Sequence, residues 1–208
     1  MDFATFLEKT PSIQTKKLGG LEAQFKLAPA MRLGYSSEKI KAKYPKKAAV
    51  LALFYPNKDN ETCFLLTQRA QYKGTHSAQI SFPGGKVEAT DATLKDTALR
   101  ESFEEVGIAK EAVTVLREMT DVYIPPSNFL ATPFIGISLK KPTFTSNHEV
   151  AQLLEIPVSA LLQEANITFR TLSTSYATNI EVPCFQFKDI IVWGATAMML
   201  SEIKELLR

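Results

Sequence analysis

Two apolar runs joined by a short turn constrain this fold more than any other feature of the chain. Residues 48–55 are almost wholly apolar, residues 62–67 form a second such run, and residues 56–60 between them include Pro, Asn and Asp. Short apolar runs bounded by turn-forming residues are typical of buried β-strands. The sequence therefore predicts a hairpin of buried strands near the start of a folded domain.

The remaining pattern alternates strands with helices. Strands are predicted over 79–82, 113–117, 133–139 and 181–187, helices over 91–106, 159–164 and 196–207, and a loop over 125–128. The strongest helix should begin with Thr90 or Asp91 as its N-cap and stop at Gly107. Its apolar residues at helical spacing are Leu94, Ala98, Leu99, Phe103 and Val106. This order predicts an α/β (α+β) architecture with a mixed β-sheet between helices.

Charge and hydropathy exclude several classes of protein. Lys and Arg exceed Asp and Glu by only 24 to 22, which argues against a nucleic-acid partner. No apolar run reaches the roughly 18 residues of a membrane span, and the first residues do not resemble a secretory signal, so we expect a cytoplasmic protein without membrane contact. Cys63 and Cys184 have no second ligand at metal spacing and are predicted to be buried free thiols.

The composition changes once along the chain. Residues 1–46 combine short amphipathic pieces with a lysine-rich stretch, and the buried-strand pattern follows directly after them. We expect an N-terminal extension over 1–46, packed on a single main domain over 47–208. A homodimer formed through the extension is left open, because nothing in the sequence gives the extension a role.

One helix face carries a cluster of acids. On the predicted helix, Glu101, Glu104 and Glu105 fall within an arc of roughly 100° because they are spaced by three and four residues. Carboxylates so close repel one another unless a cation lies among them. Simple solvation of an acidic face is the alternative, but it does not account for Arg100 inside the acidic run. All-oxygen ligands without Cys or His favour Mg²⁺ or Mn²⁺ over zinc.

The segment resembles the Nudix box, the signature of hydrolases that cleave nucleoside diphosphates linked to another moiety. Its matching residues are Gly85, Arg100, Glu101, Glu104, Glu105, Gly107 and Ile108. Asp91 stands where the box has its first Glu, one residue farther from Arg100 than in the general pattern, and Ser102 occupies an apolar position. The resemblance implies a Nudix-like α/β/α sandwich around the mixed sheet.

The residues around the box are similar to the coenzyme A pyrophosphatase branch of that family. The similarity lies in Leu65-Leu-Thr-Gln-Arg69, His76, Gln79, Phe82-Pro-Gly-Gly85, Asn147-His-Glu-Val150, Ile156-Pro157 and Trp193-Gly-Ala-Thr-Ala197. It implies Mg²⁺- or Mn²⁺-dependent hydrolysis of coenzyme A or acyl-coenzyme A to 3′,5′-ADP and (acyl-)4′-phosphopantetheine. Gly74 and Ala78 occupy positions where that branch has Arg and Gly, and Lys73 is the candidate to replace the missing cation.

The resemblance also assigns catalytic roles. Glu101 and Glu105 would be the principal metal ligands and Glu104 the third, with the Gly85 carbonyl as a further ligand. Arg100 would orient the carboxylates and could pair with Glu104. A box glutamate such as Glu104, or Glu149 outside the box, would be the base that deprotonates water; Glu149 could instead be a simple helix-start acid.

The substrate-binding residues leave more alternatives open. Arg69 could bind phosphate or pair with a box acid, and His76 could contact phosphate or be structural. The lysines of 39–47 could hold the 3′-phosphate of coenzyme A, although a solvated basic edge explains them better. Other dinucleotides such as ADP-ribose or NADH, or a Nudix-fold binding module without catalysis, are the competing functions.

Overall fold

The computed structural model describes residues 1–70, 79–173 and 178–208. In these residues eight strands form one sheet, whose main path runs β3-β2-β1-β7-β5. The strands are β1 (Lys46–Pro56), β2 (Thr62–Arg69), β3 (Ile80–Ser81), β4 (Gly84–Lys86), β5 (Thr114–Glu118), β6 (Val122–Ile124), β7 (Phe129–Ile137) and β8 (Val150–Pro157). Strand β1 is parallel to β7 and antiparallel to β2 and β4, so the sheet is mixed, as predicted.

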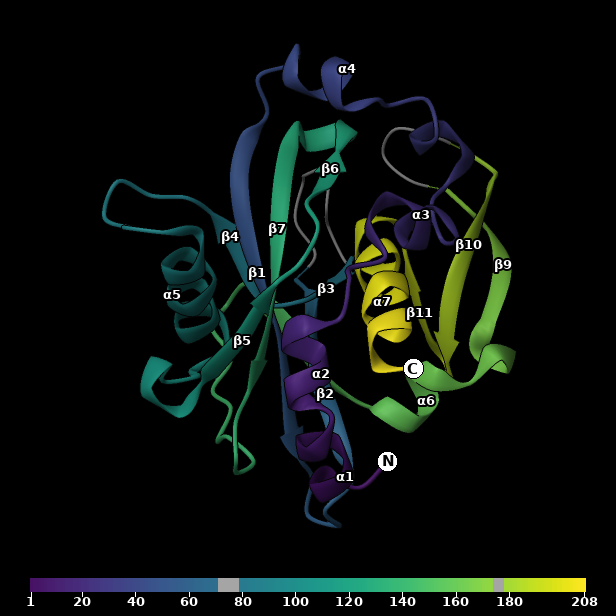
Figure 1. Ribbon diagram of the computed structural model, residues 1–208. Coiled ribbons are helices and arrows are strands. Elements are labelled where there is room, and N and C mark those ends of the chain that lie inside the picture. The colour runs from purple at the N-terminus through teal and green to yellow at the C-terminus, as the bar shows by residue number, and fades with distance from the viewer. Residues whose placement is uncertain (71–78, 174–177) are drawn as a thin grey trace.

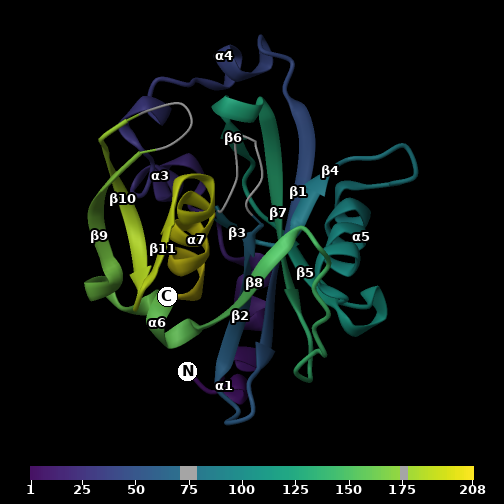
Figure 2. The same cartoon turned by 180° about the vertical axis from the view of Figure 1, so that it is seen from behind.

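Helices cover both faces of this sheet (Figures 1 and 2). Helix α5 (Leu94–Val106) packs on one face, and α1 (Phe3–Glu8), α2 (Thr10–Thr15) and α7 (Gly194–Leu207) lie on the other. Alternate residues of β1 supply the two cores: Leu51 and Leu53 pack in the cluster under α5, and Phe54 packs in the cluster under α7. Burial on both sides explains why this strand is a continuous apolar run. The predicted sandwich is confirmed.

The other elements flank the α7 side of the molecule. A second, three-stranded sheet lies beside α7 in Figure 1, and short helices precede β1 and connect the strands. These elements are α3 (Gly20–Phe25), η1 (Ala30–Arg32), α4 (Ser37–Lys41), η2 (Lys110–Ala112), η3 (Pro125–Ser127), α6 (Val158–Leu162), η4 (Glu164–Asn166), β9 (Ile167–Leu172), β10 (Ile180–Phe187) and β11 (Ile190–Trp193). No helix in the described ranges is long and apolar enough to cross a bilayer.

Most predicted elements are present with shifted ends. Strand β7 begins four residues before the predicted 133–139, α6 begins one residue before 159–164 and ends two residues earlier, and β3 covers only two residues of 79–82. The loop predicted over 125–128 holds the single turn η3. Strands β4, β6, β8, β9 and β11 were not predicted. Cys63 and Cys184 are buried and unpaired with each other, as expected.

Helix α5 corrects the predicted start of the strongest helix. Its N-cap is Thr93, whose hydroxyl accepts a hydrogen bond from the Asp96 N–H at 3.2 Å, rather than Thr90 or Asp91. Gly107 ends it in a left-handed conformation with φ of 74°, as predicted. Phe103 is 58% exposed and does not belong to the buried face. Ser102 is on the buried face instead. Its hydroxyl donates a hydrogen bond to the Ala98 carbonyl at 2.7 Å, so its burial leaves no unpaired polar group.

The N-terminal residues join the same core as the sheet. Phe3, Phe6 and Ile13 pack in the cluster that also contains residues of α7. The carboxylate of Glu202 on α7 is buried and accepts hydrogen bonds from the Gly20 N–H at 2.9 Å, the Gln24 amide at 3.1 Å and the Thr120 hydroxyl at 2.6 Å. One acidic side chain thus holds α3 and the segment after β5 against α7.

Replacement of Glu202 by alanine should destabilise the protein by about 2–4 kcal/mol, because three donors lose a buried acceptor at once. Urea unfolding would measure the loss. Glu22→Ala, on the exposed side of α3, is the matched control and should cost less than about 0.5 kcal/mol. Equal stability of the two variants would show that Glu202 does not anchor the N-terminal residues.

Candidate active site

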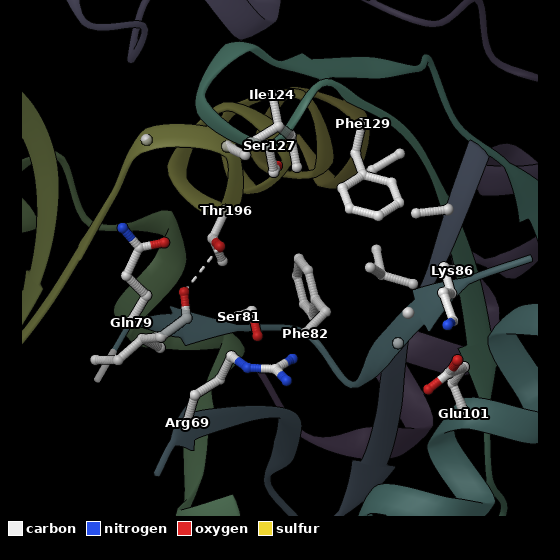
Figure 3. Close-up of a pocket in the computed structure, with 18 of the residues that line it drawn as sticks. Arg69, Gln79, Ser81, Phe82, Lys86, Glu101, Ile124, Ser127, Phe129 and Thr196 are labelled. Atoms are coloured by element: carbon white, nitrogen blue, oxygen red, sulfur yellow. Dashed lines mark hydrogen bonds between the residues drawn. The ribbon is translucent and has the colours of Figure 1, made fainter. Parts of the chain in front are cut away.

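A cavity of about 560 Å³ lies between α5 and the first turn of α7. In Figure 3, Arg69 and Glu101 lie along one side of it, Ile124, Ser127 and Phe129 along the opposite side, and the ring of Phe82 between them. Residues of β1, β4, α5, the β6–β7 connection and the first turn of α7 contribute to its lining. The cavity is therefore built from segments that are far apart in sequence.

The acids predicted on one face of α5 line this cavity. The side chain of Glu105 is 7% exposed, that of Glu101 is 15% exposed, and that of Glu104 is 51% exposed. Burial raises the pKa of Glu101 and raises that of Glu105 to about 7, because a carboxylate loses hydration there. Two carboxylates are thus held at the cavity wall in an environment that disfavours their charge.

The glycine pair before α5 brings the main chain close to these acids. Strand β4 pairs with β1, which places Gly85 opposite Ala49 and Gly84 opposite Val50. A Cβ atom on Gly85 would lie 2.4 Å from the carboxyl carbon of Glu101, so any larger residue there would push this carboxylate out of its observed position. The N–H of Gly84 donates to Oε2 of Glu105 at 3.1 Å. The strand therefore positions both buried carboxylates.

Arg100 lies among the acids and holds them together. Its Nη1 donates to Glu101 and to Glu104, each at 3.1 Å, and the pair with Glu104 is the one predicted. Its strongest partner is Asp91, which accepts from Nε at 2.8 Å and from Nη2 at 2.9 Å. This two-point contact holds the pKa of Asp91 well below its usual value. Asp91 thus anchors Arg100, a role that its spacing in the sequence did not reveal.

Replacement of Asp91 by asparagine should lower the free energy of unfolding by about 1–3 kcal/mol at pH 7, since a nearly buried charge-assisted contact is lost. A carboxyl whose pKa is lowered by folding stabilises the fold above its ordinary pKa of 3.8 and loses this effect as pH falls further. The difference in the free energy of unfolding between this variant and the wild type should therefore become smaller below about pH 4. Urea unfolding at several pH values tests this, with the exposed Asp59→Asn as control. A difference in the free energy of unfolding that does not change with pH would contradict the ionised contact of Asp91 with Arg100.

Arg69 and Glu149 meet at the other side of the acid cluster. Arg69 ends β2, and its Nη2 donates to Oε2 of Glu149 at 2.8 Å while its Nη1 lies 3.5 Å from Oε1 of Glu105. Of the two predicted roles for Arg69, the structure shows the ion pair with a box acid. Glu149 lies in a turn just before β8, so the helix-start interpretation of this residue is wrong.

The turn that carries Glu149 is tied to the end of α5. The N–H of Asn147 donates to the Glu105 carbonyl at 3.0 Å, and the Asn147 side chain accepts from the Glu149 N–H at 2.8 Å. The last carbonyls of a helix lack partners within it, and this turn supplies one. Glu149 is thereby fixed beside the carboxylates of α5.

Comparison with known proteins identifies the family of this arrangement. Residues 45–169 match the NUDIX domain family. An uncharacterized Nudix hydrolase, NudL, of Yersinia enterocolitica is 34% identical over 146 residues, which cover 70% of this chain and 74% of the relative. NudL of Salmonella paratyphi B is 37% identical over 145 residues, covering 67% and 72%. The chain belongs to the Nudix family.

Solved Nudix structures share its fold. A MutT/Nudix protein from Enterococcus faecalis superposes with a TM-score of 0.54 at 16% identity, covering 83% of this chain and 70% of that one. The Nudix domain of Shewanella oneidensis NrtR, solved with ADP-ribose, gives 0.51 at 15% identity and covers 85% and 96%. These two likenesses show the fold alone. The match to the NUDIX family and to the NudL relatives makes the chain a Nudix hydrolase of nucleoside diphosphate derivatives, and Nudix hydrolases use divalent cations.

The charges of the Nudix cavity fit such a cation. Among the described residues five acids line it, Glu88, Glu101, Glu104, Glu105 and Glu149, against three cationic side chains, Arg32, Arg69 and Lys86. A diphosphate is itself anionic, so added positive charge is needed where it meets the acids. Within the described residues no three acidic, His or Cys side chains lie close enough to hold a metal ion, and arginines hold the carboxylates of this Nudix box in ion pairs.

The structure brings most of the predicted site residues to one cavity. Gly85, Glu101, Glu104, Glu105, Glu149 and Arg69 all line it, and Arg100 contacts three of the acids around it. His76 and Lys73 lie outside the described residues. Sequence reasoning missed Arg32, which lines the same Nudix cavity from the N-terminal residues. Nothing in its local sequence marks it, because only the packing of residues 1–46 on the sheet brings it there.

Proposed function

We propose that this Nudix hydrolase cleaves the diphosphate of coenzyme A or acyl-coenzyme A in the cytoplasm, giving 3′,5′-ADP and (acyl-)4′-phosphopantetheine. The main support for diphosphate hydrolysis is the group of buried carboxylates at one end of a large cavity. The resemblance of residues 65–85 to the coenzyme A branch supports the substrate. The apolar side chains of Phe82, Ile124 and Phe129, on the other parts of the cavity wall, suit an uncharged pantetheine arm.

Oxygen ligands for Mg²⁺ or Mn²⁺ are at hand in this cavity. Glu101 and Glu105 would hold the ion, with Glu104 and the Gly85 carbonyl as further ligands, since these groups offer only oxygen donors. The bound ion would neutralise diphosphate charge and lower the pKa of water. Arg100 keeps the carboxylates in place through its contacts with Asp91, Glu101 and Glu104.

Two residues act on the reacting groups in this proposal. Glu149 takes the proton of the attacking water, whose oxygen bonds to one phosphorus while the bridging oxygen leaves with the other. Arg69, already paired with Glu149, orients that carboxylate and offers its guanidinium to a phosphate oxygen. His76 and Lys73 are proposed to contact the substrate as well. Residues 1–46 are proposed as an extension to a domain formed by 47–208.

A substrate panel tests the proposal. Coenzyme A, acetyl-coenzyme A, ADP-ribose and NADH are compared at equal concentration with Mg²⁺ and with Mn²⁺, and the products are separated by chromatography. We expect the highest kcat/KM for the two coenzyme A compounds, with 3′,5′-ADP released. Higher kcat/KM for a compound without pantetheine would assign the enzyme to another dinucleotide. No hydrolysis of any compound would indicate a binding module.

A further inference from the structure

Residues 30–47 form an open surface at one end of the molecule. Helix α4, which lies within this segment, is the outermost helix at that end in both views of the fold (Figures 1 and 2). Of residues 30–44, all but Arg32, Tyr35 and Ile40 are exposed. A segment placed in this way can meet a flat partner without displacing the rest of the fold.

Large apolar side chains are exposed on this surface. Eight such side chains are exposed in the described residues, and three of them lie in this short segment. Met31 is 47% exposed, Leu33 is 55% exposed and Tyr44 is 87% exposed. A single exposed apolar side chain is ordinary, but several together mark contact with a protein or a membrane.

Positive charge is concentrated in the same segment. Residues 30–47 contain six Lys and Arg and one acid, Glu38, so the segment carries a net charge of +5 whereas the whole chain carries +2. Arg32 is buried and donates to the Tyr123 carbonyl. The other five cations are exposed lysines, namely Lys39, Lys41, Lys43, Lys46 and Lys47. The rest of the chain is net negative, so this end of the molecule faces an anionic partner.

The five lysines are free to meet such a partner. In the described part of the chain none of them forms an ion pair with an acid. Nζ of Lys39 donates to the Gly34 carbonyl at 3.2 Å, and Nζ of Lys43 lies 6.0 Å from the centre of the Tyr35 ring. These contacts fold α4 back on the residues that follow Leu33. Lysines and apolar side chains therefore lie beside one another on this surface.

The combination of residue types favours one kind of partner. A symmetric contact with a second copy of the chain would bring the lysines of both copies face to face. Nucleic acid would leave Met31 and Leu33 without a partner, and none of the exposed cations here is an arginine, the residue that pairs best with phosphates and base edges. An anionic bilayer meets both requirements, because lysines are attracted to its headgroups while apolar side chains enter the interface.

We propose that residues 30–47 bind the surface of an anionic lipid bilayer. Met31, Leu33 and Tyr44 enter the headgroup layer, and the exposed lysines lie against the lipid phosphates. A solvated basic edge, which the sequence alone favours, does not account for exposed apolar side chains beside the lysines. Contact of this kind needs no spanning segment, and it would revise the expectation of a protein without membrane contact. The proposal does not depend on the substrate of the catalytic cavity.

Sedimentation of the full chain with lipid vesicles tests the proposal. Vesicles of phosphatidylcholine alone are compared with vesicles that contain about one third phosphatidylserine, at low salt and at about 0.5 M salt. At low salt, binding to the phosphatidylserine vesicles should be at least about 10-fold tighter than to phosphatidylcholine, and high salt should weaken it by a similar factor. Equal binding to both kinds of vesicle, or binding to neither, would overturn the proposal.

Two double variants test the two parts of the surface separately. Lys41→Gln with Lys43→Gln removes exposed charge, and Met31→Ser with Leu33→Ser removes exposed apolar side chains. Each pair should weaken binding to the phosphatidylserine vesicles by about 10-fold, with an unchanged fold because all four side chains are exposed. Wild-type binding by either pair would refute the proposed contact.

Matched controls lie elsewhere on the chain. Lys58→Gln with Lys110→Gln removes two other exposed lysines, Leu139→Ser removes another exposed apolar side chain, and both controls should bind vesicles as the wild type does. An equal loss of binding in the lysine control would show that only net charge matters and would overturn the proposal. So would equally tight binding to polyaspartate that Met31→Ser with Leu33→Ser does not weaken, which would assign the surface to an acidic protein.

Discussion

Replacement of Glu105 by glutamine should lower kcat by about 10³-fold at saturating Mg²⁺, whichever nucleoside diphosphate derivative is the substrate. The proposed metal ion needs anionic oxygen ligands, and loss of one of them removes several kcal/mol of transition-state stabilisation, at a factor of ten for each 1.36 kcal/mol. The binding of Mn²⁺, followed by electron paramagnetic resonance, should weaken in parallel. Steady-state kinetics of the best substrate of the panel measures the rate.

The fold of this variant should be intact. Glutamine has nearly the shape of Glu105, its side-chain oxygen can still accept from the Gly84 N–H, and it carries no charge in a place where burial disfavours one. Thermal unfolding should therefore show no decrease in Tm. Glu111→Gln, on the exposed turn η2, is the control and should keep wild-type kinetics. Full activity and Mn²⁺ affinity in Glu105→Gln would remove Glu105 from the proposed ligands.

Local patterns were sufficient for the parts of the fold that depend on neighbouring residues. The apolar run of β1 and the glycine at the end of α5 are such features, because burial and backbone conformation select these residue types directly. The start of α5 was also marked: Thr93 is followed three residues later by Asp96, whose carboxylate accepts from the Thr93 hydroxyl at 2.7 Å. The prediction overlooked this signal in favour of Thr90 and Asp91.

Long-range pairing was not visible in the same way. Strand β8 pairs antiparallel with β2, and the Ala70 N–H donates to the Glu149 carbonyl at 2.7 Å. This pairing brings Arg69 next to Glu149, although the two residues are 80 positions apart in the sequence. The pair of Asp91 with Arg100 spans only nine residues, but it too depends on three-dimensional structure, because the turn before α5 folds back on the helix. Such contacts depend on the register of distant segments, and a residue pattern in one sequence does not encode them locally.

Replacement of Glu149 by glutamine should reduce kcat by roughly 10²- to 10⁴-fold if this carboxylate is the base that accepts the proton of water. Glutamine can still accept a hydrogen bond from Arg69, which now donates to Oε2 of Glu149 at 2.8 Å, so the turn before β8 should keep its position. What is lost is the capacity to take up a proton. Mn²⁺ affinity and KM should therefore change by less than about threefold, in contrast to Glu105→Gln.

The contrast between the two variants assigns the roles. A loss of Mn²⁺ affinity as large as the loss of rate would make Glu149 a metal ligand, and unchanged kcat would leave the role of base to a glutamate of the box such as Glu104. His148→Gln is the matched control, since its exposed side chain is in the same turn and is not among the cavity-lining residues. Because Arg69 contacts both Glu149 and Glu105, the double variant should lose less than the product of the two single effects.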